Sequence, residues 1–360
     1  MNQERLNKVL EGMKEREIPQ MLISDAPAIF YLTGKWIHTG ERLIALYLNE
    51  NGNHKLFINE LFPVTEDLGV EKVWFNDNQD GVEIISKYVE KDKVMGVDKN
   101  WPARFLLRLM ELEGGSKFVN GSIIIDRARM FKDEKEKELM RASSKANDAA
   151  MEKLYSLFKE NQDLSEKEVG ERLAKIYSDL GAERFSFDPI VGYGANAADP
   201  HHENDGSKLK EGDCIVLDIG CVKDSYCSDM TRVFFYKSVP EHSKKVYDTV
   251  VAANMAGIAA VKPGVRFCDI DKASRDVIEK AGYGKYFTHR TGHSIGIEDH
   301  DLGDVSAVNT EEIKPGMIFS IEPGIYLPGE VGVRIEDLVL VTEDGCEVLN
   351  KYSKELTIIE

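Results

Sequence analysis

The stretch 214–236, CIVLDIGCVKDSYCSDMTRVFFY, decides the fold because it holds two apolar runs that read as buried strands and that carry acids. Asp218 lies inside the first run, and Asp229 comes just before the second, 11 residues later. Burying an unpaired, ionised carboxylate is costly, so such groups are normally paired with a cation, protonated or bound to a metal ion. A hairpin between the two runs would bring these acids face to face.

The stretch 317–341, MIFSIEPGIYLPGEVGVRIEDLVLV, repeats this pattern with Glu322 and Glu336, which are 14 residues apart. Two expected helices precede each strand pair, so the order helix, helix, strand pair occurs twice. We predict two similar half-units around one centre. The expected helices cover residues 133–159, the segment opened by the capping pattern Ser165-x-x-Glu168, residues 241–262 and residues 268–281.

Histidines concentrate in the same part of the chain. The sequence has eight histidines, and five of them lie in or near the segments that carry these acids. These five are His201, His202, His289, His293 and His300. Carboxylate oxygens with an imidazole suit manganese, cobalt or zinc, and the absence of CxxC pairs argues against a thiolate zinc site. Four acids would neutralise two divalent ions, which predicts a two-metal hydrolytic centre.

Salt bridges are the structural alternative for these acids. Arg232 follows Asp229 and Arg334 precedes Glu336, so two ion pairs would account for half of the set. A single acid in a strand is more often a salt-bridge partner than a ligand. The combination of four acids with a glycine-rich histidine cluster favours the metal site.

Two catalytic motifs are rejected on their context. Gly292–Gly296 matches the G-x-S-x-G nucleophile elbow, but no helix pattern follows it, and the only histidine beyond the serine is His300. Gly192–Ala197 matches a dinucleotide fingerprint, but Asp199 and Pro200 follow where a helix is required. This second segment is predicted to be a loop.

The composition excludes several classes of protein. The 360 residues include 46 Lys+Arg and 63 Asp+Glu, and the net charge of −17 disfavours nucleic-acid binding. The longest apolar stretch, 250–261, has 12 residues and contains Asn254, which suits a buried helix and no membrane span. The N-terminus shows no secretory signal, and five cysteines without a CxxC pair indicate a reduced, cytoplasmic protein.

The character of the sequence changes near residue 126. Residues 1–126 read as a mixed α/β unit with an amphipathic helix and short apolar runs, whereas a long, charged helical stretch follows. A chain of 360 residues is also typical of about two domains. We therefore predict domains at residues 1–128 and 129–360.

Five segments resemble the successive signature segments of the pita-bread metallopeptidases, in particular their Xaa-Pro dipeptidase (prolidase) and aminopeptidase P branch. YLTG at 31–34 and the N-terminal unit resemble the creatinase-type domain of that branch, so the resemblance spans the chain. It implies an α/β (α+β) fold with a creatinase-like N-terminal α/β domain and a C-terminal pita-bread metallopeptidase domain with pseudo-two-fold halves. The five segments are SFDPIVGYGANAADPHH (186–202), DIGCVKDSYCSDMTR (218–232), HRTGHSIGIEDHD (289–301), SIEPGIY (320–326) and VRIEDLVLV (333–341).

The resemblance also implies a ligand set for two divalent metal ions, expected to be manganese, with cobalt or zinc as alternatives. Asp218 would bind the first metal through both carboxylate oxygens, and Asp229 would bridge the two ions. His293 and Glu322 would bind the second metal, and Glu336 would bridge the pair.

Catalytic roles follow from the same resemblance. Glu322 would also shuttle the proton between the metal-bound water and the leaving amine. His201 matches the family's upstream histidine near the scissile amide, and His289 and His300 match the two that flank the metal-binding histidine. Imidazoles at these places would donate to the oxyanion or to the proline nitrogen. Arg334 is expected to orient the carboxylate of Glu336.

The implied function is hydrolysis of the Xaa-Pro bond of short, proline-containing peptides by a homodimer, with a metal-bridging hydroxide attacking the carbonyl. An Xaa-Pro dipeptidase (prolidase) is favoured, and an aminopeptidase P that acts on longer peptides is the alternative. A non-catalytic peptide- or protein-binding relative and a metal-free creatinase are disfavoured because all five ligand positions are filled. A methionine aminopeptidase is also disfavoured, because these enzymes normally lack the N-terminal domain that is expected here at residues 1–128.

Three positions depart from the family pattern. Ser294 replaces a usual glycine, and Asp199 stands where an apolar residue is common. Asp304 stands where some dipeptidases have an arginine that holds the proline carboxylate, and a cation is the obvious partner for such a group. The sequence therefore leaves the dipeptide preference open.

Overall fold

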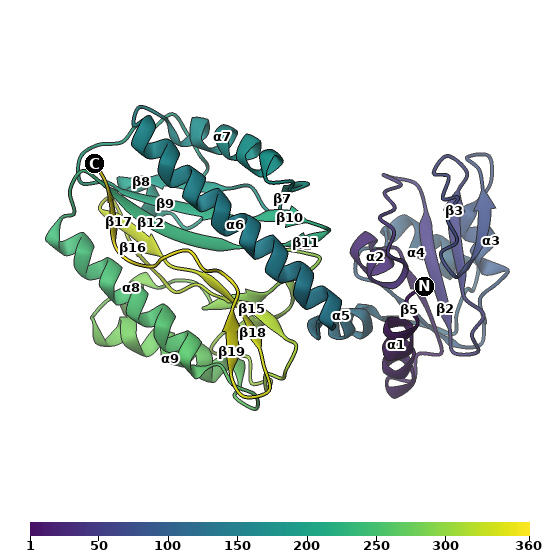
Figure 1. The fold of residues 1–360 in the computed structure, drawn as a ribbon. Helices are drawn as coiled ribbons and strands as arrows, with labels where there is room; N and C mark the ends of the chain where they lie inside the picture. The colour runs from purple at the N-terminus through teal and green to yellow at the C-terminus, as the bar shows by residue number, and fades with distance from the viewer. The chain divides into compact units, whose positions relative to one another are not determined.

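The computed structural model describes residues 1–360 and divides into two compact units, Met1–Arg129 and Met130–Glu360 (Figure 1). Each unit has its own sheets and its own apolar core. The mixture of helices and strands agrees with the predicted α/β class. No helix in either unit is both long and apolar enough to span a bilayer.

The first unit is built on one six-stranded sheet in the order β4-β3-β2-β1-β5-β6. β1 pairs antiparallel with β2 and parallel with β5, so the sheet is mixed. Every residue of β1 and β2 is buried, as expected for the central strands of a covered sheet. The strands are β1 (Gln20–Ile23), β2 (Ile44–Asn49), β3 (Lys55–Asn59), β4 (Glu71–Phe75), β5 (Val94–Val97) and β6 (Lys117–Asn120), and the helices are α1 (Gln3–Glu15), α2 (Ala26–Thr33), α3 (Gly81–Ser86), α4 (Ala103–Glu111) and α5 (Ser122–Met130).

The second unit contains two helix pairs, each followed by strands, as predicted. The side chains of Asp133 and Ser165 form capping boxes that start the first two helices. The ends of the three helices whose bounds were predicted lie within two residues of those bounds. The helices are α6 (Glu134–Glu160), α7 (Glu166–Asp179), α8 (Glu241–Ala260) and α9 (Phe267–Lys280), with short 3-10 helices at Gly194–Ala198 and Gly284–Tyr286.

The strands of this unit form four sheets. The larger two have the orders β20-β12-β9-β8 and β14-β13-β15-β18-β19, and the smaller two are β11-β10-β7 and β16-β17. Figure 1 shows α6 and α7 on one side of these strands and α8 and α9 on the other. The strands are β7 (Arg184–Phe185), β8 (Ile190–Tyr193), β9 (Cys214–Ile219), β10 (Cys221–Lys223), β11 (Tyr226–Cys227), β12 (Met230–Tyr236), β13 (Gly292–Ser294), β14 (Asp301–Val305), β15 (Ile318–Ile321), β16 (Gly324–Leu327), β17 (Val331–Arg334), β18 (Asp337–Val341), β19 (Cys346–Val348) and β20 (Thr357–Ile359).

Alternation along β9 decides the face on which Asp218 lies. Ile215 and Leu217 pack into the apolar core formed with α6 and α7, whereas Val216 packs into the core formed with α8. Successive side chains of a strand point to opposite faces, so Asp218 lies on the face of Val216. Thr231 in β12 is the antiparallel partner of Asp218 and shares this face.

Candidate metal centre

A cavity of about 570 Å³ in the second unit brings the predicted site residues together. It is lined by all nine of them, from both halves of the unit. These residues are Asp218, Asp229, His293, Glu322, Glu336, His201, His289, His300 and Arg334.

The predicted ligands occupy corresponding places in the two halves. Thr231 joins the halves, because its backbone carbonyl accepts from Glu336 N at 3.2 Å and its hydroxyl donates to Glu336 Oε2 at 2.7 Å. Asp218 lies in β9, His293 lies in β13, Asp229 immediately precedes β12, Glu322 immediately follows β15 and Glu336 immediately precedes β18.

The ligand side chains form a compact cluster around His293. The Nε2 atom of His293 lies 3.4 Å from Asp229 Oδ2 and 3.4 Å from Glu322 Oε1. Asp229, His293 and Glu336 each offer a ligand atom, and these atoms lie within 4.8 Å of one another. The same three residues are at most 5% exposed. Their spacing and burial suit a shared ion.

Unpartnered oxygens test whether these residues fit a metal. Asp218 Oδ1, Asp229 Oδ1 and Glu336 Oε1 are buried and accept no hydrogen bond. A buried polar atom without a partner is costly and rare, and three of them in one cluster require an explanation. Carboxylate oxygens together with one imidazole are a suitable donor set for divalent ions. The residues present therefore fit the predicted metal ions.

Arg334 pairs directly with Asp218 and not with Glu336, the partner that we predicted. Its Nη2 atom lies 2.5 Å from Asp218 Oδ2, and its Nη1 atom donates to the Tyr326 hydroxyl at 2.8 Å. Arg334 Nε donates to Thr231 Oγ1 at 3.1 Å, and Thr231 in turn donates to Glu336. Arg334 ends β17, and its long side chain reaches across to β9, so it orients Glu336 only through Thr231.

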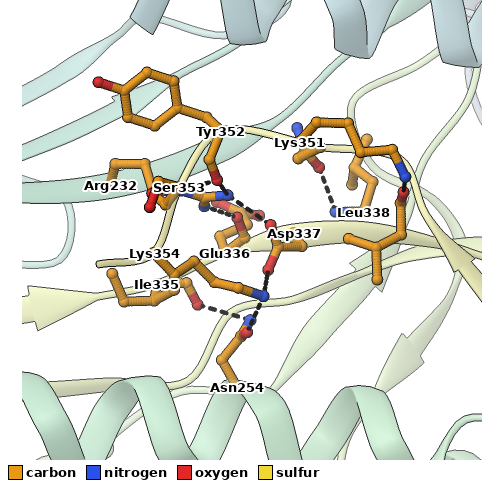
Figure 2. A network of polar contacts seen from close by, with 12 residues as sticks. Arg232, Asn254, Ile335, Glu336, Asp337, Leu338, Lys351, Tyr352, Ser353 and Lys354 are labelled. Carbon is orange, nitrogen blue, oxygen red and sulfur yellow. Dashed lines mark hydrogen bonds and ion pairs between the residues drawn. The ribbon is translucent and has the colours of Figure 1, made fainter. Parts of the chain in front are cut away.

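Arg232 also has a different partner from the one that the salt-bridge alternative suggested. Figure 2 shows it next to Asp337, whose Oδ1 atom accepts from Arg232 Nη2 at 2.7 Å. Lys354 Nζ donates to Asp337 Oδ2 at 2.6 Å and to Asn254 Oδ1 at 3.0 Å. Arg232 Nη1 donates to the carbonyl of Glu336 at 2.6 Å. This network holds the backbone of Glu336 and leaves Asp229 without a salt bridge to Arg232.

Burial and mutual repulsion raise the pKa values of several acids in the cluster. Burial raises the pKa of Asp229 and of Glu336 well above the usual range, and neighbouring acids raise both pKa values further. Burial also raises the pKa of Glu322 to about 7, although the charge of Arg334 opposes this shift. A divalent cation favours the ionised form of every carboxylate beside it. The cluster therefore favours binding either protons or cations.

We expect the stabilisation by metal ions to grow with pH. An acid whose pKa is raised by folding stabilises the fold fully below its unfolded pKa of about 4.3, and this contribution is lost as the pH rises through the folded pKa. The folded pKa is about 7 for Glu322, so the metal-free protein loses this contribution between about pH 4.3 and pH 7. The measurement is the difference in melting temperature between manganese-loaded and EDTA-treated protein, which cancels the titration of distant groups. A difference that shrinks over this range would contradict the expectation.

His289 has both ring nitrogens engaged by the chain. Nδ1 lies 2.7 Å from the carbonyl of Arg290, and Nε2 lies 2.8 Å from the Tyr326 hydroxyl. A carbonyl can only accept, so Nδ1 carries the proton and Nε2 accepts from Tyr326. Burial lowers the pKa of His289 to about 4, in keeping with a neutral ring. The ring therefore supports Tyr326, which accepts from Arg334.

A buried carboxylate anchors the loop that carries His201. Glu166, at the start of α7, is fully buried and lies 2.6 Å from His202 Nε2. Ligand atoms of Glu166, His202 and Asp205 are close enough to hold a metal, but both oxygens of Glu166 already have partners, so this group is an anchor. The other donors to Glu166 are Tyr193 N at 2.8 Å, Asn196 Nδ2 at 3.0 Å and Asp205 N at 3.1 Å.

Neither rejected motif has the context that its chemistry requires. Gly292–Ser294 forms β13 and pairs with its neighbours in a sheet, so no strand-to-helix elbow exists there. The segment Gly192–Ala197, predicted to be a loop, is instead the end of β8 followed by a 3-10 helix. Gly194 turns the chain between them at a φ of 51°, a conformation that glycine adopts readily.

The structure adds residues that the sequence reasoning did not single out. Asp299 and Arg290 line the cavity, and Asp299 Oδ1 is buried without a partner. His300 lies beside them, with its ring centroid 3.9 Å from that of His293 and its side chain 59% exposed. Asp299 and Arg290 both fall within the segment 289–301, so their proximity to His293 in the sequence was the available signal.

Comparison with known proteins gives matches along the whole chain. Residues 138–343 match the model of metallopeptidase family M24, and residues 5–131 match that of the creatinase/prolidase N-terminal domain. The putative dipeptidase YkvY of Bacillus subtilis is 35% identical over 99% of both chains. Among solved structures, a dipeptidase from Pyrococcus horikoshii OT3 is 33% identical with a TM-score of 0.92, over 98% of this chain and 99% of that one. A prolidase from the same organism is 29% identical with a TM-score of 0.90 over the same shares.

Proposed function

Since this chain belongs to metallopeptidase family M24, we propose that it is an Xaa-Pro dipeptidase that uses two divalent metal ions to hydrolyse the bond before proline in short peptides. The observation that carries the proposal is the cluster of buried carboxylates with unpartnered oxygens around His293. Buried oxygens without partners are costly, and metal ions bound among them would remove that cost.

The proposed ligands are the five residues that cluster in the cavity. Asp218 would bind the first ion, Asp229 and Glu336 would bridge, and His293 and Glu322 would bind the second. Ions bound there would supply a hydroxide nucleophile near neutral pH and a Lewis acid for the scissile carbonyl. We propose manganese as the ion, with cobalt or zinc as alternatives.

The chain's own residues would handle the protons. Glu322 faces the cavity, and its Oε1 accepts from Ser320 Oγ at 3.0 Å, which holds the carboxyl in place. The nitrogen of proline carries no proton in the peptide and must gain one to leave, and we propose that Glu322 delivers it. His201 and His300 line the same cavity and would donate hydrogen bonds to the developing oxyanion. His289 would act by positioning Tyr326 and Arg334.

We propose further that residues 1–128 form the creatinase-type N-terminal domain and residues 129–360 the catalytic domain, and that the protein is a cytoplasmic homodimer. The relatives named as dipeptidases and prolidase support a peptide substrate. A non-catalytic binding protein would not need all five ligand positions filled.

An aminopeptidase P that prefers longer peptides is the second candidate, and Asp304 is the observation that favours it. A dipeptidase must recognise the free carboxylate of its substrate, whereas an aminopeptidase must leave room beyond proline. An acid at position 304 supplies no charge complementary to a carboxylate.

The ratio of two initial rates decides between these candidates. We expect the manganese-loaded protein to cleave Ala-Pro faster than Ala-Pro-Ala under identical conditions, because a carboxylate next to proline would be bound at the site. Faster cleavage of the tripeptide would identify an aminopeptidase P. Cleavage of neither peptide would contradict the proposed function.

A further inference from the structure

Few cationic side chains line the cavity. Two arginines, Arg290 and Arg334, face six carboxylates, and no lysine lines the cavity. The two divalent ions of the proposed site would offset four of these acid charges, so a free carboxylate of a substrate still requires a cation that the acids do not already engage. The six acids are Asp188, Asp218, Asp229, Asp299, Glu322 and Glu336.

Only one of the two arginines is available to a ligand. Arg334 is 3% exposed, and its guanidinium is already bonded to Asp218, Tyr326 and Thr231. Arg290 is exposed at the cavity, and its guanidinium forms no ion pair or hydrogen bond within the chain. A guanidinium without a carboxylate partner among so many acids is therefore free to pair with a ligand.

The backbone around Arg290 is held firmly although its side chain is free. Its carbonyl lies 2.7 Å from His289 Nδ1, and the carbonyl of His289 accepts from Arg275 Nη2 at 3.0 Å. On the other side, Thr291 Oγ1 donates to Asp271 Oδ1 at 2.7 Å. Anchoring on both sides limits where the side chain can reach, which lowers the entropic cost of binding a ligand.

Asp304 does not compete for this role. It lies in β14 opposite His293, is not part of the cavity lining, and its carbonyl accepts from Asn309 Nδ2 at 2.8 Å. A guanidinium offers a charged fork that matches a carboxylate, which an imidazole ring does not.

We propose that Arg290 binds the C-terminal carboxylate of a dipeptide substrate and so determines the preference for dipeptides. This inference rests on the proposed function and deepens it, because it supplies the cation that position 304 lacks. Arg290 would take no part in bond cleavage. It would contribute only to substrates whose free C-terminal carboxylate belongs to the residue that follows the scissile bond.

The test compares Ala-Pro with Ala-Pro-amide, which differ only in the charge at the C-terminus. In the manganese-loaded protein, Arg290→Gln should lower kcat/KM for Ala-Pro by about 10- to 100-fold, since bidentate bonds to a charged group are lost. The same variant should change kcat/KM for Ala-Pro-amide by no more than about 3-fold. The amide has no carboxylate to pair with Arg290, so only the screened, long-range effect of the lost charge remains. Arg290→Lys should restore part of the loss because it returns the charge without the fork.

Lys285→Gln is the matched control. Lys285 is exposed, lies five residues before Arg290 and does not line the cavity, so this change removes one nearby positive charge without touching the proposed contact. It should leave the ratio of the two kcat/KM values unchanged.

Two outcomes would overturn the inference. If Arg290→Gln lowers kcat/KM equally for Ala-Pro and Ala-Pro-amide, Arg290 only adjusts the electrostatic field of the cavity carboxylates. If it lowers kcat/KM for neither peptide, the substrate carboxylate binds elsewhere. If the wild type cleaves neither peptide, the proposed function fails, and calorimetric binding of the reduced-bond analogue Ala-ψ[CH2N]-Pro and of its amide still tests Arg290. In that experiment the ratio of the affinity for the analogue to the affinity for its amide is compared between the wild type and Arg290→Gln. An unchanged ratio would overturn the inference.

Discussion

Asp229→Asn is expected to reduce Ala-Pro hydrolysis by more than about 1,000-fold, a loss of roughly 4 kcal/mol of transition-state stabilisation. Asp229 is 4% exposed, its Oδ2 atom lies 3.4 Å from His293 Nε2, and its Oδ1 atom has no partner. The amide preserves the size of the side chain but removes the charge that would bridge two cations. Initial rates at saturating manganese measure the effect.

The same substitution should stabilise the metal-free protein at about pH 8. Burial raises the pKa of Asp229 well above its usual range, and the charges of Glu336 and Asp218 raise it further, so the ionised carboxylate opposes folding. Denaturant midpoints in EDTA measure this gain. A higher midpoint together with lost activity distinguishes a missing metal ligand from a misfolded protein.

Asp224→Asn is the matched control for this pair of measurements. Asp224 is exposed in the turn between β10 and β11 at a φ of 49°, which asparagine also tolerates. The control should retain activity, and its denaturant midpoint in EDTA should equal that of the wild type. Full activity of Asp229→Asn would overturn the two-metal proposal.

Asp337→Asn should destabilise the protein by about 3–5 kcal/mol, because it leaves a buried arginine without its counter-charge. Asp337 is fully buried and Arg232 is 1% exposed, and their side chains meet at 2.7 Å. Burial alone would raise the pKa of Asp337, but Arg232 and Lys354 outweigh it, so the net pKa lies below the usual range. Its stabilising contribution is thus present at neutral pH and is lost as the pH falls through this lowered pKa.

The measurement is the free energy of unfolding at neutral pH, with melting temperature as a second readout. A loss of this size should lower the melting temperature by about 6–20 °C. Asp276→Asn is the control, because it removes one partner of the exposed pair with Lys272, which is expected to contribute less than about 0.5 kcal/mol. Similar effects of the two substitutions would show that the buried network does not stabilise the fold.

The network also links stability to the metal centre. Arg232 Nη1 donates to the carbonyl of Glu336, the residue immediately before Asp337 (Figure 2). Loss of the carboxylate would loosen Arg232 and with it the backbone that presents Glu336. We therefore expect Asp337→Asn to weaken manganese binding as well.

Much of the site was predictable because acids inside apolar strands are rare and costly. Asp218, Asp229, Glu322 and Glu336 stood out on that ground, and the structure places all four in one cavity with His293. The helix bounds were predictable for a related reason, since capping residues and apolar spacing act over one or two turns.

The partners of the arginines were not predictable. Proximity in the sequence suggested Glu336 for Arg334 and Asp229 for Arg232, but neither pair lies within a single strand, because Glu336 falls between β17 and β18 and Asp229 precedes β12. The register of β9 against β12 places Asp218 opposite Thr231, and this brings Asp218 within reach of Arg334.

The sequence by itself determined that this chain has two α/β domains and that the acids inside its apolar strands need a cation, a proton or a metal ion as a partner. Only the tertiary structure decided which donors are already used, because that depends on contacts between segments more than 100 residues apart, such as Asp218 with Arg334. Arg290 and His289 show the difference most clearly. They are adjacent in the chain, yet packing engages both nitrogens of the histidine and leaves the guanidinium beside it free to bind a ligand.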